Sequence, residues 1–480
     1  MLSWLRFGHP QRKDPAFALT TSGSPGGQSA APALVLTREN IPRNIIQLAI
    51  PAVGENLLMT MVFIVNTLLI GRLKDPAALA AVSLGGLFLN VADRLFSAVS
   101  VTATALVAHA WGAEDYERAR RIAAQSILLA ILFAAVTTLI IWPLASSMLE
   151  LMGASERAIA LGTMYMRVIL FTSLLGFPMV VLNGIMRGSG DTQTPLTITL
   201  IMNVWNVLVA AALVFGMGPV PALGLAGAAL ATASARLLGG ILALGLVMSG
   251  NRFLQVGLRD ILRWDGNLIA YMVRLSLPTA GESIILRLGF ILFMRIVSAL
   301  GEVALAAHQI AINVESLSFM PGHGLSVAST TLVGQSMGAR KPDLAEESIR
   351  SAMRLSLAVM GAVGVIFALF GPSLAAAFGS TPEVLALAGS AVRIGALEQL
   401  PIAVRMVIGG SLRGAGDMRT PVYATLVGTL LFRVPIVYLF AIVFGWGLNG
   451  VWLGTAVDWT ARATLIYFLF RRGAWKKIRL

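Results

Sequence analysis

Long apolar stretches follow one another along most of the chain, and short polar or charged segments separate them. A helix that crosses a bilayer needs about 20 mostly apolar residues, and these stretches are long enough. The even number of stretches puts both ends of the chain on one side of the membrane. The pattern predicts twelve membrane-spanning helices, at 43–71, 77–108, 121–145, 157–187, 194–216, 222–249, 268–299, 303–334, 347–371, 383–413, 420–445 and 449–472.

The composition agrees with a membrane protein. Hydrophobic residues make up 57% of the 480 positions and charged residues 12%, whereas a soluble domain has about 45–50% and about 25%. The absence of cysteine excludes disulfide scaffolds, thiolate metal sites and cysteine nucleophiles. No lysine follows a glycine, so the chain has no P-loop for ATP. We therefore expect no catalytic residues, no metal site and no cofactor.

The distribution of basic residues predicts the orientation. With both termini inside, most Lys and Arg fall in the inner loops and tails, and the outer loops keep only Arg72, Lys74 and Arg157. The positive-inside rule then predicts a multi-pass protein of the plasma membrane with both termini cytoplasmic. The rule also explains the net charge of +13 without a nucleic-acid partner.

The two halves of the chain repeat each other. Pro51–Glu55 (PAVGE) matches Pro278–Glu282 (PTAGE), and Met186–Pro195 (MRGSGDTQTP) matches Leu412–Pro421 (LRGAGDMRTP), at spacings of 227 and 226 residues. Six helices per half predict a parallel repeat about an axis along the membrane normal, as in many secondary transporters. The fold class expected is all-α and polytopic, with a disordered cytoplasmic tail at 1–42, an N-lobe at 43–250, a cytoplasmic linker at 251–267, a C-lobe at 268–472 and a basic cytoplasmic tail at 473–480.

The repeated RGxGD turns are the most polar motif of the repeat. Within each turn the arginine and the aspartate can pair, Arg187 with Asp191 and Arg413 with Asp417. A stiff inner hairpin and a hinge or latch for alternating access are both open interpretations. A third, remote one is an intramembrane aspartyl protease, whose two aspartates share a proton. That interpretation needs both aspartates inside an apolar span, whereas these lie in polar turns.

Further short motifs lie in the spans and at their ends, beside the two RGxGD turns: Gly71-Arg72-Leu73, Ala306–Gln309 (AAHQ), Leu332–Gln335 (LVGQ) and Met337–Ala339 (MGA). Together these motifs resemble those of the MATE (multidrug and toxic compound extrusion) transporters of the MOP flippase superfamily. The resemblance covers roughly residues 43–472. It implies two six-helix lobes in a V shape, export of amphipathic, cationic organic compounds, and exchange for protons or sodium.

Positions that hold coupling acids in branches of this family are neutral here. They are Asn66, Ala210, Leu286 and Ile402. A neutral amide, a methyl group or an aliphatic side chain cannot release a proton, so the family's coupling acids do not carry over. Coupling must then use other acids within the spans.

Six acids remain within the spans, and ionisable groups there are costly enough to be functional candidates. Glu282 and Glu398 lie near mid-span, and we expect them, with Glu55, to carry the coupling ion. Asp458 stands four residues before Arg462 and is expected to pair with it. The remaining two are Asp93, which has no evident partner, and Glu315. We assign the substrate cavity to Asn66, Trp205, Asn206, His308, Gln309 and Glu315.

Arginines outnumber acids within the spans, which indicates a cavity that is not simply acidic. The function we expect is a secondary active antiporter that exports amphipathic compounds in exchange for protons or sodium by alternating access. Its partners are then a small-molecule substrate, a coupling ion and the bilayer, and we expect a monomer. The alternative within the superfamily is a flippase for a lipid-linked or anionic substrate. The arginines are Arg94, Arg167, Arg236, Arg287, Arg295, Arg393, Arg405, Arg433 and Arg462.

Overall fold

The computed structural model describes residues 34–217, 221–250, 255–478 and 480. Most of the predicted tail at 1–42 and four residues of the predicted linker lie outside the described residues. The first half of the chain forms α1 (Ile41–Gly71), α2 (Pro76–Gly112), α3 (Tyr116–Leu151), α4 (Glu156–Phe171), α5 (Ser173–Gly176), α6 (Pro178–Gly188), α7 (Gln193–Phe215) and α8 (Leu225–Ser249).

The second half begins with a short helix, α9 (Leu258–Leu262), between the two sets of spans. It continues with α10 (Gly266–Ser298), α11 (Glu302–Gly338), α12 (Pro342–Ala376), α13 (Pro382–Gly395), η2 (Ala396–Glu398), α14 (Gln399–Gly414), α15 (Arg419–Val427), η3 (Gly428–Arg433), α16 (Val434–Tyr438), η4 (Leu439–Val443), α17 (Gly447–Arg471) and η5 (Ala474–Lys477).

The twelve predicted spans correspond to helical segments of this structure, which confirms the expected fold class. Among the described residues, eight helices are long and apolar enough to cross a membrane, and α4 with α5–α6, bent by 55°, makes a ninth. The other three spans fall outside that set. They are the ones that carry Glu282, Glu398 and Asp458.

Side chains just before the helices start several of the spans. Asp75 accepts a hydrogen bond from the Ala77 amide at 3.0 Å before α2, and Asp265 accepts one from the Leu268 amide at 3.0 Å before α10. An N-cap carboxylate satisfies amides that have no partner within the helix and favours the positive end of its dipole. Asp115 caps α3 in the same way. These acids fix where the long apolar segments begin.

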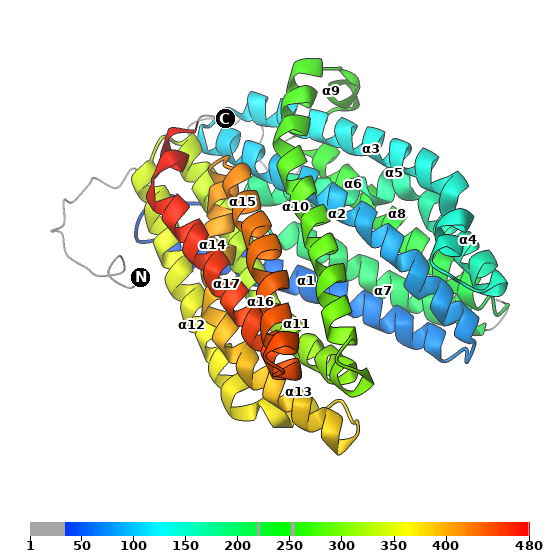
Figure 1. The fold of residues 1–480 in the computed structure, drawn as a ribbon. Helices are drawn as coiled ribbons and strands as arrows, with labels where there is room; N and C mark the ends of the chain where they lie inside the picture. The colour runs from blue at the N-terminus through cyan, green and yellow to red at the C-terminus, as the bar shows by residue number, and fades with distance from the viewer. Residues whose placement is uncertain (1–33, 218–220, 251–254, 479) are drawn as a thin grey trace.

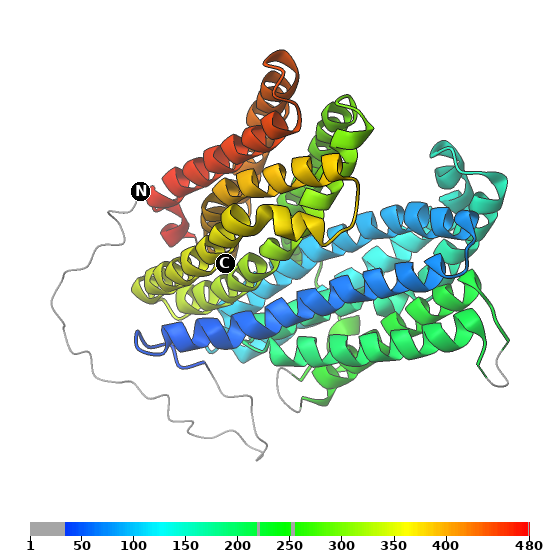
Figure 2. The ribbon, with the colours of Figure 1, turned by 90° about the horizontal axis from the view of Figure 1, so that it is seen from below.

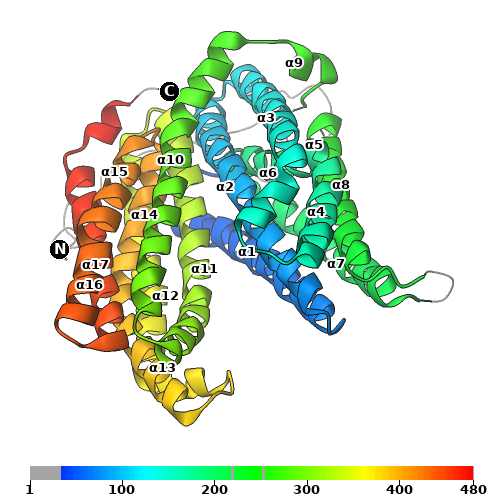
Figure 3. The same ribbon diagram turned by 45° about the vertical axis from the view of Figure 1, so that its right-hand side comes forward.

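The helices form two lobes that meet at one end and separate toward the other. Figure 3 shows α1–α8 on one side and α10–α17 on the other, with the C-terminus and α9 near the end where the lobes meet. Figures 1 and 2 show the same arrangement from other directions. We call these the converging end and the diverging end. At the junction, α1 and α2 of the first lobe pack against α11 of the second.

Two pairs of apolar clusters hold the lobes together internally. Of the two clusters near the converging end, one adds Met272 of α10 to the first lobe and the other adds Ile45 of α1 to the second lobe, so both cross the junction. The other two clusters lie near the diverging ends of the lobes. Alanine is prominent in all four, and Ala103, Ala130, Ala328 and Ala352 are completely buried. Small residues allow helix backbones to approach closely, which is how helices associate where lipid removes the hydrophobic driving force.

The inner ends of α2 and α11 touch through glycines. A Cβ on Gly112 would lie 2.0 Å from the carbonyl oxygen of Gln335, and one on Gly338 would lie 2.0 Å from that of His109. These are repeat-related positions, so each helix presses its glycine against the other's backbone. No other residue type fits this contact without moving the helices apart.

The same two helices exchange reciprocal hydrogen bonds with the opposite lobe. His109 Nε2 lies 2.9 Å from the Gly414 carbonyl oxygen, and Gln335 Nε2 donates to the Gly188 carbonyl at 3.0 Å. Gly188 and Gly414 are the last residues of α6 and α14, whose final carbonyls have no partner within the helix. The junction therefore satisfies two helix ends while joining the lobes.

The segment between the lobes is fastened to α3. Arg120 donates to both carboxylate oxygens of Asp260 in α9, at 3.0 and 2.8 Å. This contact, with a further one from the Gly257 amide, lowers the pKa of Asp260 below its ordinary value. Gln125 of α3 donates to the Arg263 carbonyl at 2.7 Å. The connection is thus a bound segment of the structure rather than a loose tether.

We expect Gly112→Ala to lower stability, because its methyl group would collide with the Gln335 backbone. Overpacking of this kind costs about 1–3 kcal/mol. Gly86→Ala on the same helix is the matched control, since nothing lies within 4 Å of its Cβ. The control should be neutral or stabilise by about 0.5–1 kcal/mol through helix propensity. Thermal unfolding of both proteins in detergent checks this, and equal melting temperatures would contradict the described contact.

Candidate functional site

Glu282 in α10 is held by a dense set of donors. Arg405 Nη2 donates to its Oε1 at 2.7 Å, Arg413 Nη2 to its Oε2 at 2.6 Å, and Thr425 Oγ1 to its Oε1 at 2.7 Å. The carboxylate side chain is only 5% exposed. Two guanidinium groups on one buried carboxylate strongly favour its ionised form, and taking it away would leave both arginines without their partner.

The first lobe repeats this arrangement in simpler form. Glu55, the repeat partner of Glu282, accepts from Arg187 Nη1 at 3.0 Å and from Asn183 Nδ2 at 2.9 Å. Arg187 is the repeat partner of Arg413. Each lobe therefore has one buried carboxylate–arginine pair that joins its first helix to the end of its fourth span.

These pairs show that the expected Arg187–Asp191 and Arg413–Asp417 contacts are wrong. Asp191 instead accepts from the Gln193 and Thr194 amides at 2.8 and 2.9 Å, and Asp417 does the same at the start of α15. Both aspartates cap the following helix, where unpaired amides attract a short acidic side chain more strongly than a distant guanidinium does. Each aspartate is bonded to its own turn, and no hydrogen bond joins the two within the described residues, as a catalytic dyad would require.

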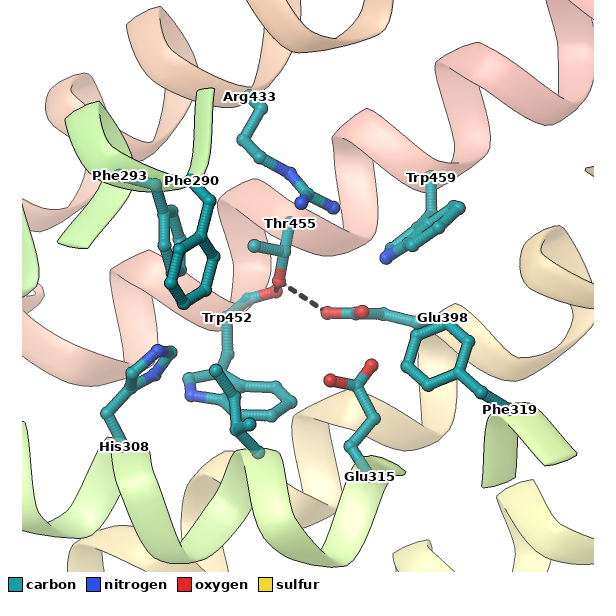
Figure 4. A pocket seen from close by; sticks show the side chains of 11 residues that line it. Phe290, Phe293, His308, Glu315, Phe319, Glu398, Arg433, Trp452, Thr455 and Trp459 are labelled. Atoms are coloured by element: carbon teal, nitrogen blue, oxygen red, sulfur yellow. Dashed lines mark hydrogen bonds between the residues drawn. The ribbon is translucent and has the colours of Figure 1, made fainter. Parts of the chain in front are cut away.

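A small pocket in the second lobe brings together acids and aromatic rings from four spans. Its volume is about 80 Å³, well above the roughly 10–15 Å³ that one water needs. Figure 4 shows Glu315 of α11 and Glu398 of η2 with their carboxyl groups pointing toward each other across it. The other lining residues are Phe290, Phe293, His308, Ile312, Phe319, Arg433, Trp452, Thr455 and Trp459.

The two acids of this pocket, unlike Glu282, have few donors. Thr455 Oγ1 donates to Glu398 Oε1 in a short hydrogen bond. Glu315 Oε1 has no hydrogen-bond partner among the described residues. Neither acid forms an ion pair with a described residue. Arg433, which also lines the pocket, instead donates from its Nε to Asp458 at 2.7 Å. The pocket thus holds two facing carboxyl groups without a bound counter-charge.

An ion-pair cluster shares Arg433 with the pocket. Asp458 is fully buried and accepts from Arg462 Nε and Arg433 Nε, both at 2.7 Å. The expected Asp458–Arg462 pair is therefore confirmed. Arg462 also donates to Thr429 at 3.1 Å and passes directly over the bare backbone of Gly428. This cluster is closed, since every charge in it has a partner.

The first lobe has a neutral polar cluster where the second has acids. Asn66 of α1 donates to Thr232 Oγ1 of α8 at 3.3 Å. Asn206 of α7 is 1% exposed, and its amide has no partner among the described residues. Thr232 is the repeat partner of Thr455. The first threonine therefore accepts a hydrogen bond from an amide, and its partner in the other lobe donates one to a carboxyl group.

The predicted substrate cavity divides between the lobes. His308 and Glu315 lie in the second-lobe pocket, where they meet Glu398 of the predicted coupling acids, whereas Asn66 and Asn206 lie in the first lobe. Gln309 is exposed, and its Nε2 donates to Asn313 Oδ1 of its own helix at 3.5 Å. Trp205 is 45% exposed and donates to Ser234 at 3.2 Å.

Further features of the structure escaped the sequence analysis. Asp93, which had no evident partner in the sequence, accepts hydrogen bonds from Nη1 and Nη2 of Arg236 at 3.2 and 2.9 Å. Thr455 and Arg433 complete the pocket without having been named as site residues for it. The spacing of Trp452, Thr455 and Trp459 on one face of α17 was the signal available for this pocket.

Comparison with known proteins places the chain in a family. The sequence model of the MatE family matches residues 51–212 and 278–439, one segment in each lobe. The chain belongs to the MatE family. This confirms the resemblance drawn from the motifs, and it identifies the molecule as a transporter rather than a protease.

Its relatives match along nearly their whole length. The probable multidrug resistance protein NorM of Thermotoga maritima is 33% identical over 447 residues, which are 92% of this chain and 95% of the relative. The multidrug resistance protein PmpM of Pseudomonas aeruginosa is 27% identical over 91% of this chain and 92% of its own. An outward-facing multidrug resistance MATE transporter superposes with a TM-score of 0.85 at 23% identity, over 94% of this chain and all of that one.

We expect Glu282→Gln to be strongly destabilising, by about 3–5 kcal/mol, because Arg405 and Arg413 lose their buried counter-charge. Glu55→Gln should act in the same direction on Arg187. Glu302→Gln, in the exposed first turn of α11, is the control and should change stability by less than about 1 kcal/mol. Thermal unfolding in detergent measures all three. A Glu282→Gln protein as stable as the Glu302→Gln control would show that this pair does not hold the lobe together.

Proposed function

We propose that the protein is a secondary active antiporter that exports amphipathic organic compounds in exchange for protons. Two relatives named as multidrug resistance proteins, matched over nine-tenths of the chain, support the export of such compounds. The observation that supports proton exchange is the second-lobe pocket, where Glu315 and Glu398 face each other with no paired cation.

The chemistry of this pocket suits a proton. Two carboxylates that face each other at close range in an apolar site repel, so the pair favours holding one proton between them. The surrounding Phe rings offer no donor, and the ring nitrogens of His308 and Trp452 have no hydrogen-bond partner among the described residues. Thr455 orients one oxygen of Glu398 and leaves the other toward Glu315. A site of this kind loads a proton from one side and releases it to the other when its surroundings change.

The other acids proposed from the sequence have less suitable surroundings. Glu282 is bound by two arginines, and Glu55 by Arg187 and Asn183. Protonation of either acid would leave a buried guanidinium group without its counter-charge. We therefore assign a structural role to Glu282 and to Glu55. The coupling we propose therefore keeps Glu398 from the sequence analysis and adds Glu315.

Sodium is the alternative coupling ion. A sodium ion requires several oxygen ligands, and Arg433 at the edge of the same pocket adds an opposing positive charge. No cluster of three or more His, Asp or Glu side chains suited to a metal ion occurs among the described residues. These features favour the proton.

We further propose that the converging end faces the cytoplasm of a plasma-membrane protein that works as a monomer. The basic loops predicted to be inner, the C-terminus and α9 gather at that end. Substrate would then leave from the diverging, outer end. The expected division into tails, linker and lobes at 43–250 and 268–472 belongs to this proposal.

The coupling pair is tested in liposomes that contain purified protein and rhodamine 123. We expect an imposed pH gradient to drive dye transport by the unaltered protein, and Glu315→Gln or Glu398→Gln to abolish it, because one Gln leaves a carboxyl group with no partner to share a proton. Glu383→Gln, in the first turn of α13, is the control and should pump normally.

Three readouts separate the outcomes of this experiment. Dye counterflow without a gradient should survive in both Gln variants, which shows that they fold and bind. If a sodium gradient accelerates dye transport and a pH gradient does not, the coupling ion is sodium rather than the proton. Gradient-driven transport at the unaltered rate in both Gln variants would refute the coupling pair.

The orientation is tested with tags at the two ends of the chain. An external protease added to intact, right-side-out cells should leave a tag at either terminus uncut, because both ends are proposed to be cytoplasmic. Cleavage begins only after the cells are permeabilised. A tag removed from intact cells at either end would overturn this topology.

A further inference from the structure

A groove that the proposed function leaves unused lies between α3 and α4, which are antiparallel neighbours joined by a short turn. Its volume is about 580 Å³, within the roughly 300–1,000 Å³ typical of sites that hold small molecules. Ser146 and Glu150 line one wall from the last turns of α3. The other wall is one face of α4, where Glu156, Thr163 and Arg167 recur at helical spacing. We call this the α3–α4 groove.

The α3–α4 groove lies at the diverging end of the first lobe. α3 begins beside α9 at the converging end and runs away from it, so the turn that follows α3 lies at the far end (Figure 3). Glu150 and Glu156 adjoin this turn, and Arg167 lies about 16 Å farther along α4 by helix rise. From the end of the lobe inward, the order of charges is therefore two acids and then an arginine.

These charged side chains have no counter-charge within the described residues. Arg167 Nε donates to the Trp142 carbonyl oxygen at 3.4 Å, and its guanidinium carbon lies 6.0 Å from the centre of the Trp142 ring. Neither contact supplies a negative charge. Glu150 and Glu156 are exposed and form no hydrogen bond or ion pair in the described part of the chain. One groove thus holds both signs of charge, too far apart along the helices to neutralise each other.

Two further observations show that nearby groups do not satisfy the groove. Arg157, which follows Glu156 directly, donates to Asp75 at 2.8 Å, so it is bound to an acid outside the groove. Thr163 lies one turn before Arg167, and its hydroxyl oxygen is buried without a hydrogen-bond partner among the described residues. Buried polar atoms normally have such a partner.

The apolar surface next to the groove indicates what it would bind. Phe171 lies one turn beyond Arg167 on the same face of α4 and is 79% exposed. Leu139, one turn before Trp142 on α3, is 75% exposed. The charged groove therefore continues, toward the middle of the span, into a surface that suits hydrocarbon. A ligand that follows this path needs a cation, then an anion, then apolar chains.

We propose that the α3–α4 groove binds a phospholipid whose headgroup carries a primary amine, of the phosphatidylethanolamine class. The ammonium group has three N–H donors for Glu150 and Glu156, as a lysine ammonium would. The phosphate accepts from the Nη groups of Arg167 in the planar geometry that suits a guanidinium. In a bilayer such a lipid holds its amine outermost, its phosphate next and its acyl chains inside, which is the order of the groove.

Charge selects this headgroup over two other common ones. A choline headgroup has no N–H to donate to the carboxylates of Glu150 and Glu156. A glycerol headgroup has no positive charge at all, so phosphatidylglycerol would bring only a negative phosphate to a groove with two acids. The proposal therefore predicts a preference for phosphatidylethanolamine over phosphatidylcholine and phosphatidylglycerol with the same acyl chains.

The second lobe provides a matched control. Arg393 is the repeat partner of Arg167 at a spacing of 226 residues and is also partly open to the surroundings. The positions equivalent to Glu150 and Glu156 are Ala376 and Pro382. The second lobe thus keeps the arginine without the acids, and we expect no selective lipid site there.

The test measures lipid binding to the purified full-length protein by native mass spectrometry, with the three dioleoyl lipids in turn. We expect phosphatidylethanolamine to bind about tenfold more tightly than either of the others, and Arg167→Gln to weaken its binding about tenfold, as loss of a charge-assisted contact should. Arg167→Lys should restore most of the affinity, since it retains the positive charge. Arg393→Gln should change nothing.

The acids should set the preference between headgroups. Replacing both, by Glu150→Gln with Glu156→Gln, should bring the affinities for phosphatidylethanolamine and phosphatidylcholine within about twofold of each other, because an amide offers no charge to the ammonium group. Glu302→Gln, an exposed acid in the first turn of α11, is the control and should keep the preference. Melting temperatures accompany each variant. Equal weakening of all three lipids with a lowered melting temperature indicates a structural role and overturns the site.

Other results also overturn the proposal. They are equal affinity of the unaltered protein for the three lipids, a preference for phosphatidylglycerol, and an Arg393→Gln protein that loses as much affinity as Arg167→Gln. Glycerophosphoethanolamine is the same headgroup without acyl chains, and its displacing the lipid at similar concentration would assign the groove to a soluble zwitterion instead. The test uses no ion gradient and no transported dye, so its outcome is independent of proton-coupled export.

Discussion

A carboxylate buried inside a bilayer protein is stable only where its charge is met, and this constraint divides the acids of the molecule into two kinds. Glu55, Glu282 and Asp458 each have at least one guanidinium in direct contact, and these contacts join helices distant in the sequence. Glu315 and Glu398 have none. The paired acids stabilise the packing of the helices. The second kind can change its charge without breaking an ion pair.

The repeat shows which of these features belongs to the fold and which to the function. The Glu55–Arg187 and Glu282–Arg413 pairs occupy related positions in both lobes, so two copies of one ancestral arrangement persist. The polar sites farther along the lobes have diverged. Related threonines form a hydrogen bond with an amide in the first lobe and with a carboxyl group in the second. The ion pairs shared by both lobes stabilise the fold, and the polar sites that differ give the two lobes different chemistry.

Much of the fold could be predicted from the sequence, because span length, repeat spacing and the RGxGD motif are local or periodic signals. The Asp458–Arg462 pair was predictable for the same reason, since four residues bring two side chains to one helix face. The partners of Arg187 and Arg413 were not predictable. Glu55 lies 132 residues from Arg187, and only the packing of two helices decides whether a guanidinium meets that acid or the aspartate of its own turn. The sequence assigned Glu315 to the substrate cavity rather than to coupling, because its nearness to Glu398, more than 80 residues away, shows only in the folded chain.

The reciprocal bonds from His109 and Gln335 bear on how readily the molecule can change shape. Each is a single neutral hydrogen bond to a backbone carbonyl, and such a bond contributes only about 0.5–1.5 kcal/mol net. Two of them fall well short of the roughly 5.5 kcal/mol that turns a 1:99 population into 99:1. Because they are uncharged, salt does not screen them. These two bonds alone therefore give only a weak and constant bias between open and closed arrangements, so most of the cost of separating the lobes falls on the packing of α1 and α2 against α11.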